Sequence, residues 1–233
     1  MVSKNKEGKK LIVSLNPKSP IAEQFRSVRT SIEFASVSNE MKVLVITSSE
    51  QDSGKSLISS NLALTFAQKG LRTLLIDADL RNPSIRNYFY LPKGKGLSNL
   101  IKRNVSFKDA IYQTNEKNLF ILPTGFIVAN PADLLGSSNM KELIAKLRLH
   151  FDQIIIDTPP VLVATDAVLV SSLADGILLV IRSGKSNKHS VKRAIRSINQ
   201  SATPIVGTIL NDIKMSKDDY YYGSKETKRE HAR

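Results

Sequence analysis

The sequence of 233 residues contains no cysteine, and this absence excludes several kinds of protein. Without thiols the chain can form neither a disulfide framework nor a thiolate metal centre. Its three histidines, His150, His189 and His231, lie far apart in the sequence, which argues against a histidine-based metal site. The composition is therefore compatible with a reducing cytoplasm and excludes small disulfide-stabilised folds.

Long hydrophobic runs are missing as well. No apolar stretch approaches the ~20 residues that a helix needs to cross a bilayer. The basic start, MVSKNKEGKK, is followed only by LIVSL, which is too short for the core of a signal peptide. We expect a soluble protein that stays inside the cell.

Acidic residues are in the minority, with 21 Asp and Glu against 34 Lys and Arg, for a formal net charge of +13. Basic residues cluster in the first ten positions and over residues 182–196, where no Asp or Glu intervenes. Such clusters can face nucleic acid, anionic lipid or an acidic partner, and a solvated helix face is the simpler interpretation. No recognition motif supports DNA binding, so we expect no nucleic-acid partner.

What the sequence does contain is an alternation of apolar runs with helical patterns. The apolar runs are short and rich in Ile, Leu and Val, as buried parallel strands are; they span residues 42–48, 72–78, 118–124, 151–160, 175–182 and 204–211. Helical patterns cover residues 20–34, 54–70, 138–149 and 187–200. The alternation predicts an α/β fold with a doubly wound, mostly parallel sheet flanked by helices, in one domain over residues 1–233. The polar tail, residues 215–233, is predicted to be flexible.

Polar motifs follow three of the predicted strands. They read SSEQDSGKSL after the first strand, DADLR after the second and DTPP after the fourth. Ligands of doubly wound sheets bind beyond the carboxyl ends of the strands, so we expect a functional site where these motifs meet.

The first motif ends like a phosphate-binding loop, with Gly54-Lys55-Ser56 between a predicted strand and a predicted helix. Backbone N–H groups there would point at phosphate oxygens, aided by the helix dipole. Lys55 would neutralise the β and γ phosphates, and the Ser56 hydroxyl would ligate Mg²⁺. The predicted nucleotide-binding residues are Asp52, Ser53, Gly54, Lys55, Ser56 and Leu57. The leading glycine of the usual pattern is replaced by Ser49.

Three aspartates complete this constellation. Asp157 ends a strand where a carboxylate would hold Mg²⁺, directly or through water. The alternative role of Asp157, a helix N-cap, is disfavoured by the two prolines that follow. Asp77 and Asp79 alternate at one strand end and so share a side, which is costly unless a cation or a substrate proton lies between them. Such a pair suits an enzyme that deprotonates or orients a hydroxyl nucleophile.

With TSSEQDSGKS, LLIDADLRNP and FDQIIIDTPP in this order, the chain resembles the bacterial tyrosine kinases (BY-kinases) of capsule and exopolysaccharide synthesis. It looks like their separate cytoplasmic kinase subunit of Gram-positive type, a P-loop protein related to MinD/ParA-type ATPases. The resemblance covers residues 18–223. It implies an autophosphorylating protein-tyrosine kinase that uses ATP and Mg²⁺ and acts on protein tyrosines. It also implies a separate transmembrane adaptor of the polysaccharide co-polymerase type, which would hold the kinase at the inner face of the cell membrane.

The resemblance also assigns residues. The implied catalytic set is Lys55, Asp77, Asp79 and Arg81, with Asp77 as the candidate base and Arg81 able to reach phosphate charge. The implied metal set is Ser56, Asp77, Asp79 and Asp157. Asn211 matches an adenine-contacting asparagine of related ATPases.

Two motifs near the ends of the chain fit the same family. Glu23, Arg26 and Arg29 resemble its ExxRxxR oligomerisation motif, in which one helix face bridges to neighbouring subunits of a ring. A salt-bridged surface helix is the alternative. The tyrosines of DDYYYGS resemble the family's autophosphorylated cluster, namely Tyr220, Tyr221 and Tyr222.

The loop departs from the family pattern. A typical loop reads PGEGKS, where this chain has QDSGKS over residues 51–56. Losing the Pro-Gly pair removes a conformational preset and freedom to adopt positive φ. Two alternatives therefore stay open: a MinD/ParA-like ATPase, and a weakly active nucleotide-binding assembly subunit with a degenerate loop. The tyrosine tail and the Asp77–Asp79 pair favour the kinase over the ATPase, and an ATP titration separates the second alternative.

Overall fold

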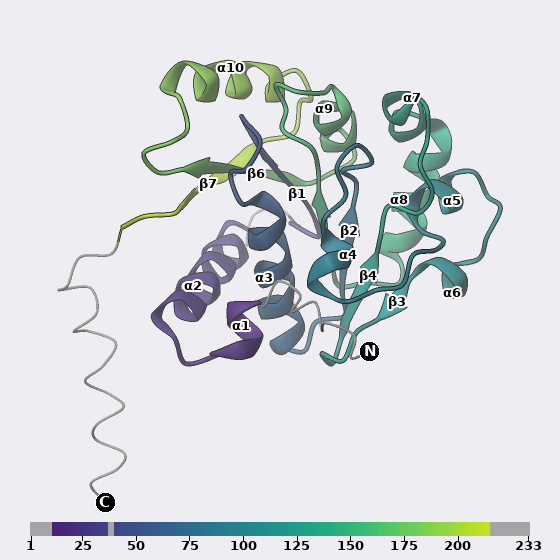
Figure 1. The fold of residues 1–233 in the computed structure, drawn as a ribbon, viewed down its shortest axis with the longest axis horizontal. Helices are drawn as coiled ribbons and strands as arrows, with labels where there is room; N and C mark the ends of the chain where they lie inside the picture. Colours follow the sequence, from purple (N-terminus) through teal and green to yellow (C-terminus); the bar gives the residue numbers. More distant parts are fainter. Residues whose placement is uncertain (1–10, 37–39, 215–233) are drawn as a thin grey trace, which may run out of the picture.

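A seven-stranded sheet forms the centre of the computed structural model, which describes residues 11–36 and 40–214 (Figure 1). The strand order is β3-β4-β2-β5-β1-β6-β7, and each neighbouring pair is parallel except β3–β4. The strands are β1 (Val43–Ser48), β2 (Thr73–Asp77), β3 (Tyr112–Gln113), β4 (Leu119–Leu122), β5 (Gln153–Asp157), β6 (Gly176–Arg182) and β7 (Ile205–Asn211). The predicted α/β fold with a mostly parallel sheet is confirmed.

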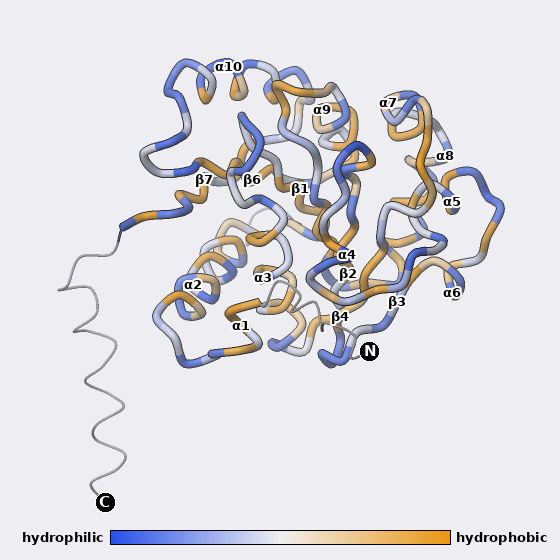
Figure 2. Tube along the Cα trace, in the orientation of Figure 1, coloured by the Kyte–Doolittle hydropathy of each residue, from blue (hydrophilic) through white to orange (hydrophobic). Residues whose placement is uncertain are grey.

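Helices cover both faces of this sheet. They are α1 (Ile12–Leu15), α2 (Pro20–Ala35), α3 (Lys55–Gln68), α4 (Ile85–Tyr88), α5 (Leu97–Ile101), α6 (Phe107–Ala110), α7 (Pro131–Leu135), α8 (Ser138–Arg148), α9 (Asp166–Ser171) and α10 (Lys188–Ile198). One core cluster joins α1–α4 to the sheet, and a second joins α5–α10 to its other face. In β1, Leu44 and Ile46 enter the first cluster while Val43 and Val45 enter the second. This two-sided burial explains why the central strands read as unbroken apolar runs (Figure 2).

The six predicted strands and four predicted helices correspond to β1, β2, β4 to β7, α2, α3, α8 and α10. The last strand, β7, differs from the uniformly buried strand that its sequence predicts. It forms an edge of the sheet, and the side chain of Leu210 there is 51% exposed. The two-residue strand β3 and the short helices were not predicted, because segments of two to six residues carry too little periodicity.

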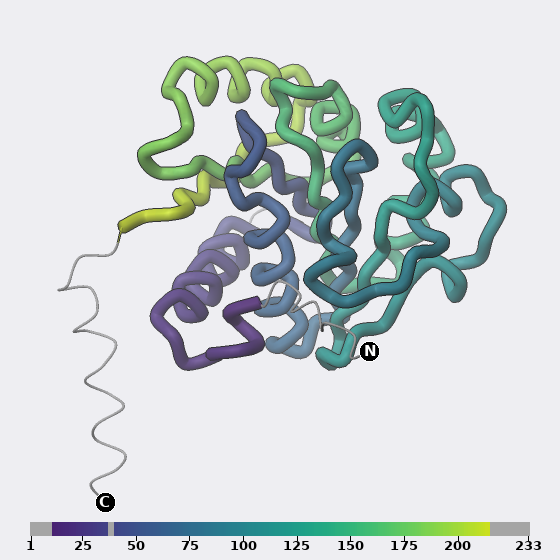
Figure 3. The backbone as a smooth tube through the Cα atoms, in the orientation of Figure 1, coloured from purple at the N-terminus to yellow at the C-terminus, as the bar shows by residue number. Residues whose placement is uncertain are grey.

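Helix α3 follows the phosphate-loop motif and is buried on nearly all sides. Its polar residues Ser60 and Asn61 bond to backbone carbonyls one turn earlier, so they are buried without losing hydrogen bonds. The trace in Figure 3 shows β1 and β6, from distant parts of the chain, lying side by side. The sheet thus brings the start of α3 next to the ends of β5, β6 and β7.

Several sequence features fall outside or at the surface of this core. Tyr220, Tyr221 and Tyr222 lie outside the described residues, as do the first ten residues. The basic residues of α10 are exposed, namely Lys188, Lys192, Arg193 and Arg196. Among the described helices, none combines the length and hydrophobicity that crossing a bilayer requires.

Candidate active site

A cleft of about 520 Å³ lies at the carboxyl ends of the strands. It is lined by residues 51–57, by Asp79, Arg81, Asn82, Ser84 and Tyr88, by Pro159, Pro160 and Val163, and by Arg182. All three polar motifs contribute to this wall, so they meet at one edge of the sheet as their positions predict. Of the predicted nucleotide-binding residues, all six from Asp52 to Leu57 line the cleft.

The loop before α3 adopts left-handed conformations at two positions. Gly54 has φ 87°, and a Cβ atom there would lie 2.3 Å from Nδ2 of Asn211, so glycine is required. Asp52 has φ 56°, a conformation that aspartate tolerates better than most residues. The loop therefore keeps a positive φ at the position where the family pattern has glycine.

A hydrogen bond from the edge strand β7 supports this loop. Asn211, the last residue of β7, donates its side-chain N–H to the Ser53 carbonyl over 2.8 Å. The Ser53 hydroxyl is buried and, within the part of the chain that the structure describes, has no hydrogen-bond partner. A buried hydroxyl without a partner is costly, and a phosphate oxygen in the cleft would satisfy it.

Lys55 opens α3 and reaches across the cleft. Its Nζ lies 3.1 Å from Oδ2 of Asp79, and both side chains are largely buried. Burial acts to lower the pKa of the Lys55 amine, but the charges of Asp157 and Asp79 outweigh burial and raise that pKa above its ordinary value. The amine is therefore a fixed positive charge in the cleft.

Ser56 and Asp157 form a buried pair between α3 and the end of β5. The Ser56 hydroxyl donates to Oδ2 of Asp157 over 2.6 Å, and the Ser59 hydroxyl lies 3.0 Å from Oδ1. Burial raises the pKa of Asp157, although Lys55 and the two hydroxyls act in the opposite direction. Ionised Asp157 thus costs free energy that a nearby cation would recover.

This donor set fits Mg²⁺. Within residues 11–36 and 40–214, no three His, Cys, Asp or Glu side chains gather closely enough to hold a metal ion by themselves. Mg²⁺ keeps several waters and binds through one or two carboxylates together with substrate phosphates, so it needs no such cage. Ser56 and Asp157 supply a hydroxyl and a carboxylate of this kind.

Asp77 occupies a different environment from Asp79. It is fully buried, and its carboxylate accepts backbone N–H groups of Asp79, Ser84 and Ile85 at 3.1–3.3 Å. Burial, followed by the charge of Asp157, raises its pKa well above the ordinary value. Asp79 lines the cleft and Asp77 does not. The prediction that both carboxylates share one side assumed that the strand continues to Asp79. Because β2 ends at Asp77, the strand alternation stops there and does not set the direction of the Asp79 side chain.

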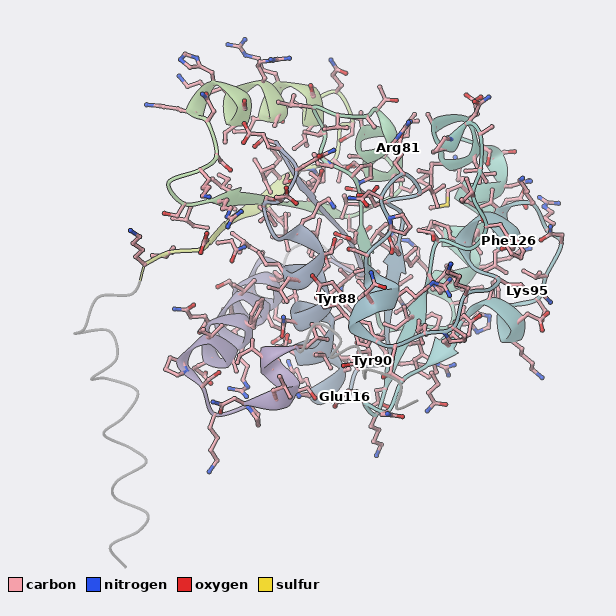
Figure 4. The ribbon with its side chains drawn as sticks, in the orientation of Figure 1. Arg81, Tyr88, Tyr90, Lys95, Glu116 and Phe126 are labelled. Atoms are coloured by element: carbon pink, nitrogen blue, oxygen red, sulfur yellow. The ribbon has the colours of Figure 1, made fainter. Side chains whose placement is uncertain are left out.

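Arg81 lies at the cleft wall (Figure 4), where its guanidinium forms two bonds to Asp166 at 3.0 and 3.1 Å. Asp166 is the first residue of α9 and is fully buried. The arginine is thus held near the predicted phosphate position by a partner that was not predicted from the sequence. Contact between Arg81 and phosphate stays a prediction.

The ExxRxxR residues lie on α2, and they do not all face outward. Arg26 pairs with Glu23 at 2.6 Å, and Glu23 is largely exposed. Arg29 instead donates to the Thr65 carbonyl of α3 over 2.7 Å and lies 3.5 Å from Glu33. Arg29 therefore fixes α2 to α3 within the chain, and its role between subunits stays a prediction.

Three further residues of the site were not predicted from the sequence. Ser59 lies one helical turn after Ser56, so the spacing of the two serines on one face was a usable signal. Tyr88, labelled in Figure 4, lines the cleft, and burial and the charge of Asp157 raise its pKa. Arg182 also lines the cleft, but it stood within a basic run and nothing marked it out.

Comparison with known proteins assigns the chain to a family. The chain is 43% identical over 218 residues to the tyrosine-protein kinase YwqD of Bacillus subtilis (strain 168), covering 93% of this chain and 92% of that protein. The chain belongs to the bacterial tyrosine-protein kinase family. The putative tyrosine-protein kinase CapB of Staphylococcus aureus is 40% identical to this chain, over 91% of this chain and 95% of CapB. A family model described as an AAA domain matches residues 41–209.

Solved structures agree with this family. The crystal structure of the chimerical protein CapA2B2 is similar with a TM-score of 0.85 and 38% identity, covering 88% of this chain and 90% of that chain. The septum site-determining protein MinD complexed with Mg-ADP, from Pyrococcus horikoshii OT3, has a TM-score of 0.64 and 23% identity, over 76% and 72% of the two chains. The MinD similarity shows a shared P-loop fold. Family and fold together imply that this tyrosine-protein kinase uses ATP.

Proposed function

We propose that this tyrosine-protein kinase transfers the γ-phosphoryl group of ATP to protein tyrosines, including its own, and thereby regulates capsule or exopolysaccharide synthesis and export. One observation carries the chemical part of the proposal. Lys55 and Ser56 at the start of α3 meet Asp157, which lies about a hundred residues later, at one end of the sheet. A phosphate cradle, a fixed cation and a buried metal carboxylate are the parts that phosphoryl transfer requires.

Each residue has a distinct role in this proposal. The backbone N–H groups of the loop bind phosphate oxygens, and Lys55 places its positive charge where negative charge develops on the transferring group. Asp79 orients Lys55 through the 3.1 Å ion pair. Mg²⁺, held by Ser56 and Asp157 when bound, neutralises phosphate charge.

Asp77 remains our candidate for the base that accepts the tyrosine proton. Its raised pKa makes its carboxylate a better proton acceptor than an ordinary aspartate. Three backbone N–H groups occupy most of the roughly four acceptor positions of its carboxylate. Asp79 lines the cleft and Asp77 does not, so an incoming hydroxyl would meet Asp79 before it reached Asp77.

The proposed partner is a separate transmembrane adaptor of the polysaccharide co-polymerase type. The chimerical protein CapA2B2 combines CapA and CapB in its name, and its structure is similar to this chain. By this proposal the kinase lies in the cytoplasm, against the inner face of the membrane, through its adaptor.

Incubation of the purified protein with ATP·Mg tests this function, followed by a phosphotyrosine blot with and without the adaptor's cytoplasmic segment. Phosphotyrosine on Tyr220, Tyr221 or Tyr222, increased by the adaptor, is the expected result. ATP hydrolysis without phosphotyrosine would favour a MinD/ParA-like ATPase. Absence of ATP binding would favour the assembly subunit with a degenerate loop.

The proposed ring assembly has its own test. Because Arg29 holds α2 against α3, whereas Arg26 pairs with exposed Glu23 and donates to the Pro17 carbonyl just before α2, the two arginines should behave differently. Arg26→Ala should weaken self-association with little change in the free energy of unfolding. Arg29→Ala should weaken association and also lower that free energy by about 1 kcal/mol. Sedimentation and urea unfolding measure the two effects, and an unchanged assembly size in both variants would contradict the motif's role.

A further inference from the structure

The ends of β6 and β7 hold the phosphate loop from its outer side. Arg182 is the last residue of β6, and its partner in the sheet register is Asn211, the last residue of β7. Arg182 Nη1 donates to the Asp52 carbonyl over 3.0 Å, while Asn211 donates to the Ser53 carbonyl over 2.8 Å. Two neighbouring strands thus bond to two successive carbonyls of one loop.

The guanidinium of Arg182 is itself held in place. Its Nε donates to Oδ2 of Asp212 over 2.9 Å, and its backbone N–H donates to the Ser186 hydroxyl over 2.9 Å. With Nε on one carboxylate and Nη1 on the loop, the planar guanidinium is fixed at two points. Its direction toward the loop is therefore set before any nucleotide arrives.

These bonds determine where loop N–H groups point. In a trans peptide the carbonyl of one residue and the N–H of the next lie antiparallel in one plane. A bond from Arg182 to the Asp52 carbonyl therefore turns the Ser53 N–H away from Arg182 and fixes the tilt of that plane. The bond from Asn211 to the Ser53 carbonyl does the same for the Gly54 N–H. Phosphate binding depends on the orientation of such N–H groups.

The hydrogen bond from Arg182 is made at Asp52, where the loop adopts a backbone conformation that its own sequence does not favour. Asp52 adopts φ 56°, a left-handed conformation that glycine enters freely but that is less favourable for a residue with a Cβ atom. Pro-Gly would preset this conformation, but Gln51-Asp52 does not.

We propose that Arg182 is a positioning residue for the phosphate-binding loop, which it holds in its binding conformation through the Asp52 carbonyl in place of a Pro-Gly preset. This inference rests on the proposed use of ATP at this site. Arg182 acts on the loop, and through the loop on the phosphates of the nucleotide.

Titration of the purified protein with ATP·Mg tests the inference, using the wild type, Arg182→Ala, Arg182→Lys, Asp52→Gly and the double variant of Asp52→Gly with Arg182→Ala. Arg182→Ala should weaken binding about tenfold, the effect of one charge-assisted hydrogen bond. Arg182→Lys should lose less, because an amine can keep one of the two bonds. In the Asp52→Gly background, removal of Arg182 should cost no more than about threefold, because glycine holds positive φ unaided.

Arg148→Ala is the matched control. Arg148 also pairs with an aspartate, Asp175, and its side chain is 29% exposed against 32% for Arg182, but Asp175 adjoins the opposite end of β6. This variant should bind ATP·Mg like the wild type. Unfolding temperatures of the nucleotide-free variants separate loop positioning from a general loss of stability. A general loss would lower the unfolding temperature together with the affinity for ATP·Mg.

Three results would overturn the inference. The first is wild-type affinity in Arg182→Ala, and the second is an equal loss in the Asp52→Gly background. The third is an equal loss of affinity in Arg148→Ala. A wild type that does not bind ATP·Mg would contradict the proposed function itself, and the inference would fall with it.

Discussion

The two sides of the phosphate loop differ in the burial of the charged residues that flank them. On the inner side, the ends of β2 and β5 present Asp77 and Asp157, which are fully buried. On the outer side, the ends of β6 and β7 present Arg182 and Asp212, which are partly exposed. Electrostatic interactions are strongest in a low-dielectric interior, so the inner side suits the chemistry. Hydrogen bonds and ion pairs at the water-exposed edge are weaker, so the outer side suits control of the loop's backbone conformation.

The largest expected effect comes from removing the cation that faces the inner side. Lys55→Met should reduce phosphotyrosine formation by at least about 100-fold, because the transferring phosphoryl group loses its main countercharge. Quantitative phosphotyrosine blots measure this loss. Lys69→Met is the control, because Lys69 pairs with Glu33 at the far end of α3 and is half exposed. Full activity in Lys55→Met would show that the charged groups on the inner side do not take part in phosphoryl transfer.

The two buried aspartates sharpen the comparison further. Asp157→Asn should abolish most activity without lowering the free energy of unfolding of the nucleotide-free protein. Its partners, Ser56 and Ser59, are hydroxyls that can rotate and bond to an amide. The substitution also removes a buried charge that is disfavoured, as its raised pKa indicates.

Asp77→Asn should also lower activity, and it should lower stability relative to Asp157→Asn, although it too removes a buried charge that its raised pKa marks as disfavoured. Its partners are backbone N–H groups, which cannot become acceptors, and an amide has one oxygen where the carboxylate has two. At least one N–H is then left unpaired, at a cost of about 1 kcal/mol. Urea unfolding of both variants is the measurement. Equal stability changes would mean that the two carboxylates do not differ as described.

The smallest expected effect concerns the loop's own sequence. Gln51→Pro with Asp52→Gly should tighten ATP·Mg binding by a few-fold, because the pair presets the positive φ that Asp52 now adopts. Equilibrium titration against the wild type measures the change. Weaker binding would show that the side chain of Asp52 contributes to the site in a way that loop conformation does not explain.

Much of this molecule could be predicted from its sequence, for a physical reason. Strands with two buried faces and helices of eleven or more residues carry strong patterns, so the strands other than β3, together with α2, α3, α8 and α10, were predictable. The convergence of Lys55, Asp79 and Asp157 followed from their positions at the ends of parallel strands.

What could not be predicted depends on side-chain direction and on distant partners. Nothing local distinguishes Arg29, which turns inward to Thr65, from Arg26, which does not. The bonds from Arg81 to Asp166 and from Arg182 to Asp52 join residues 85 and 130 positions apart. Such pairs exist only once the sheet order is known, and a single sequence does not state that order.

The long separations within the site have a consequence for synthesis of the chain. The loop at residues 52–56 is made early, yet Asp157 and Asn211, which complete its surroundings, lie 101 residues from Ser56 and 158 from Ser53. Contacts of such high sequence separation form only after the intervening chain exists. A ribosome-bound chain therefore carries the nucleotide-binding signature for most of its synthesis without the cleft, and the cleft is complete only after β7 has emerged.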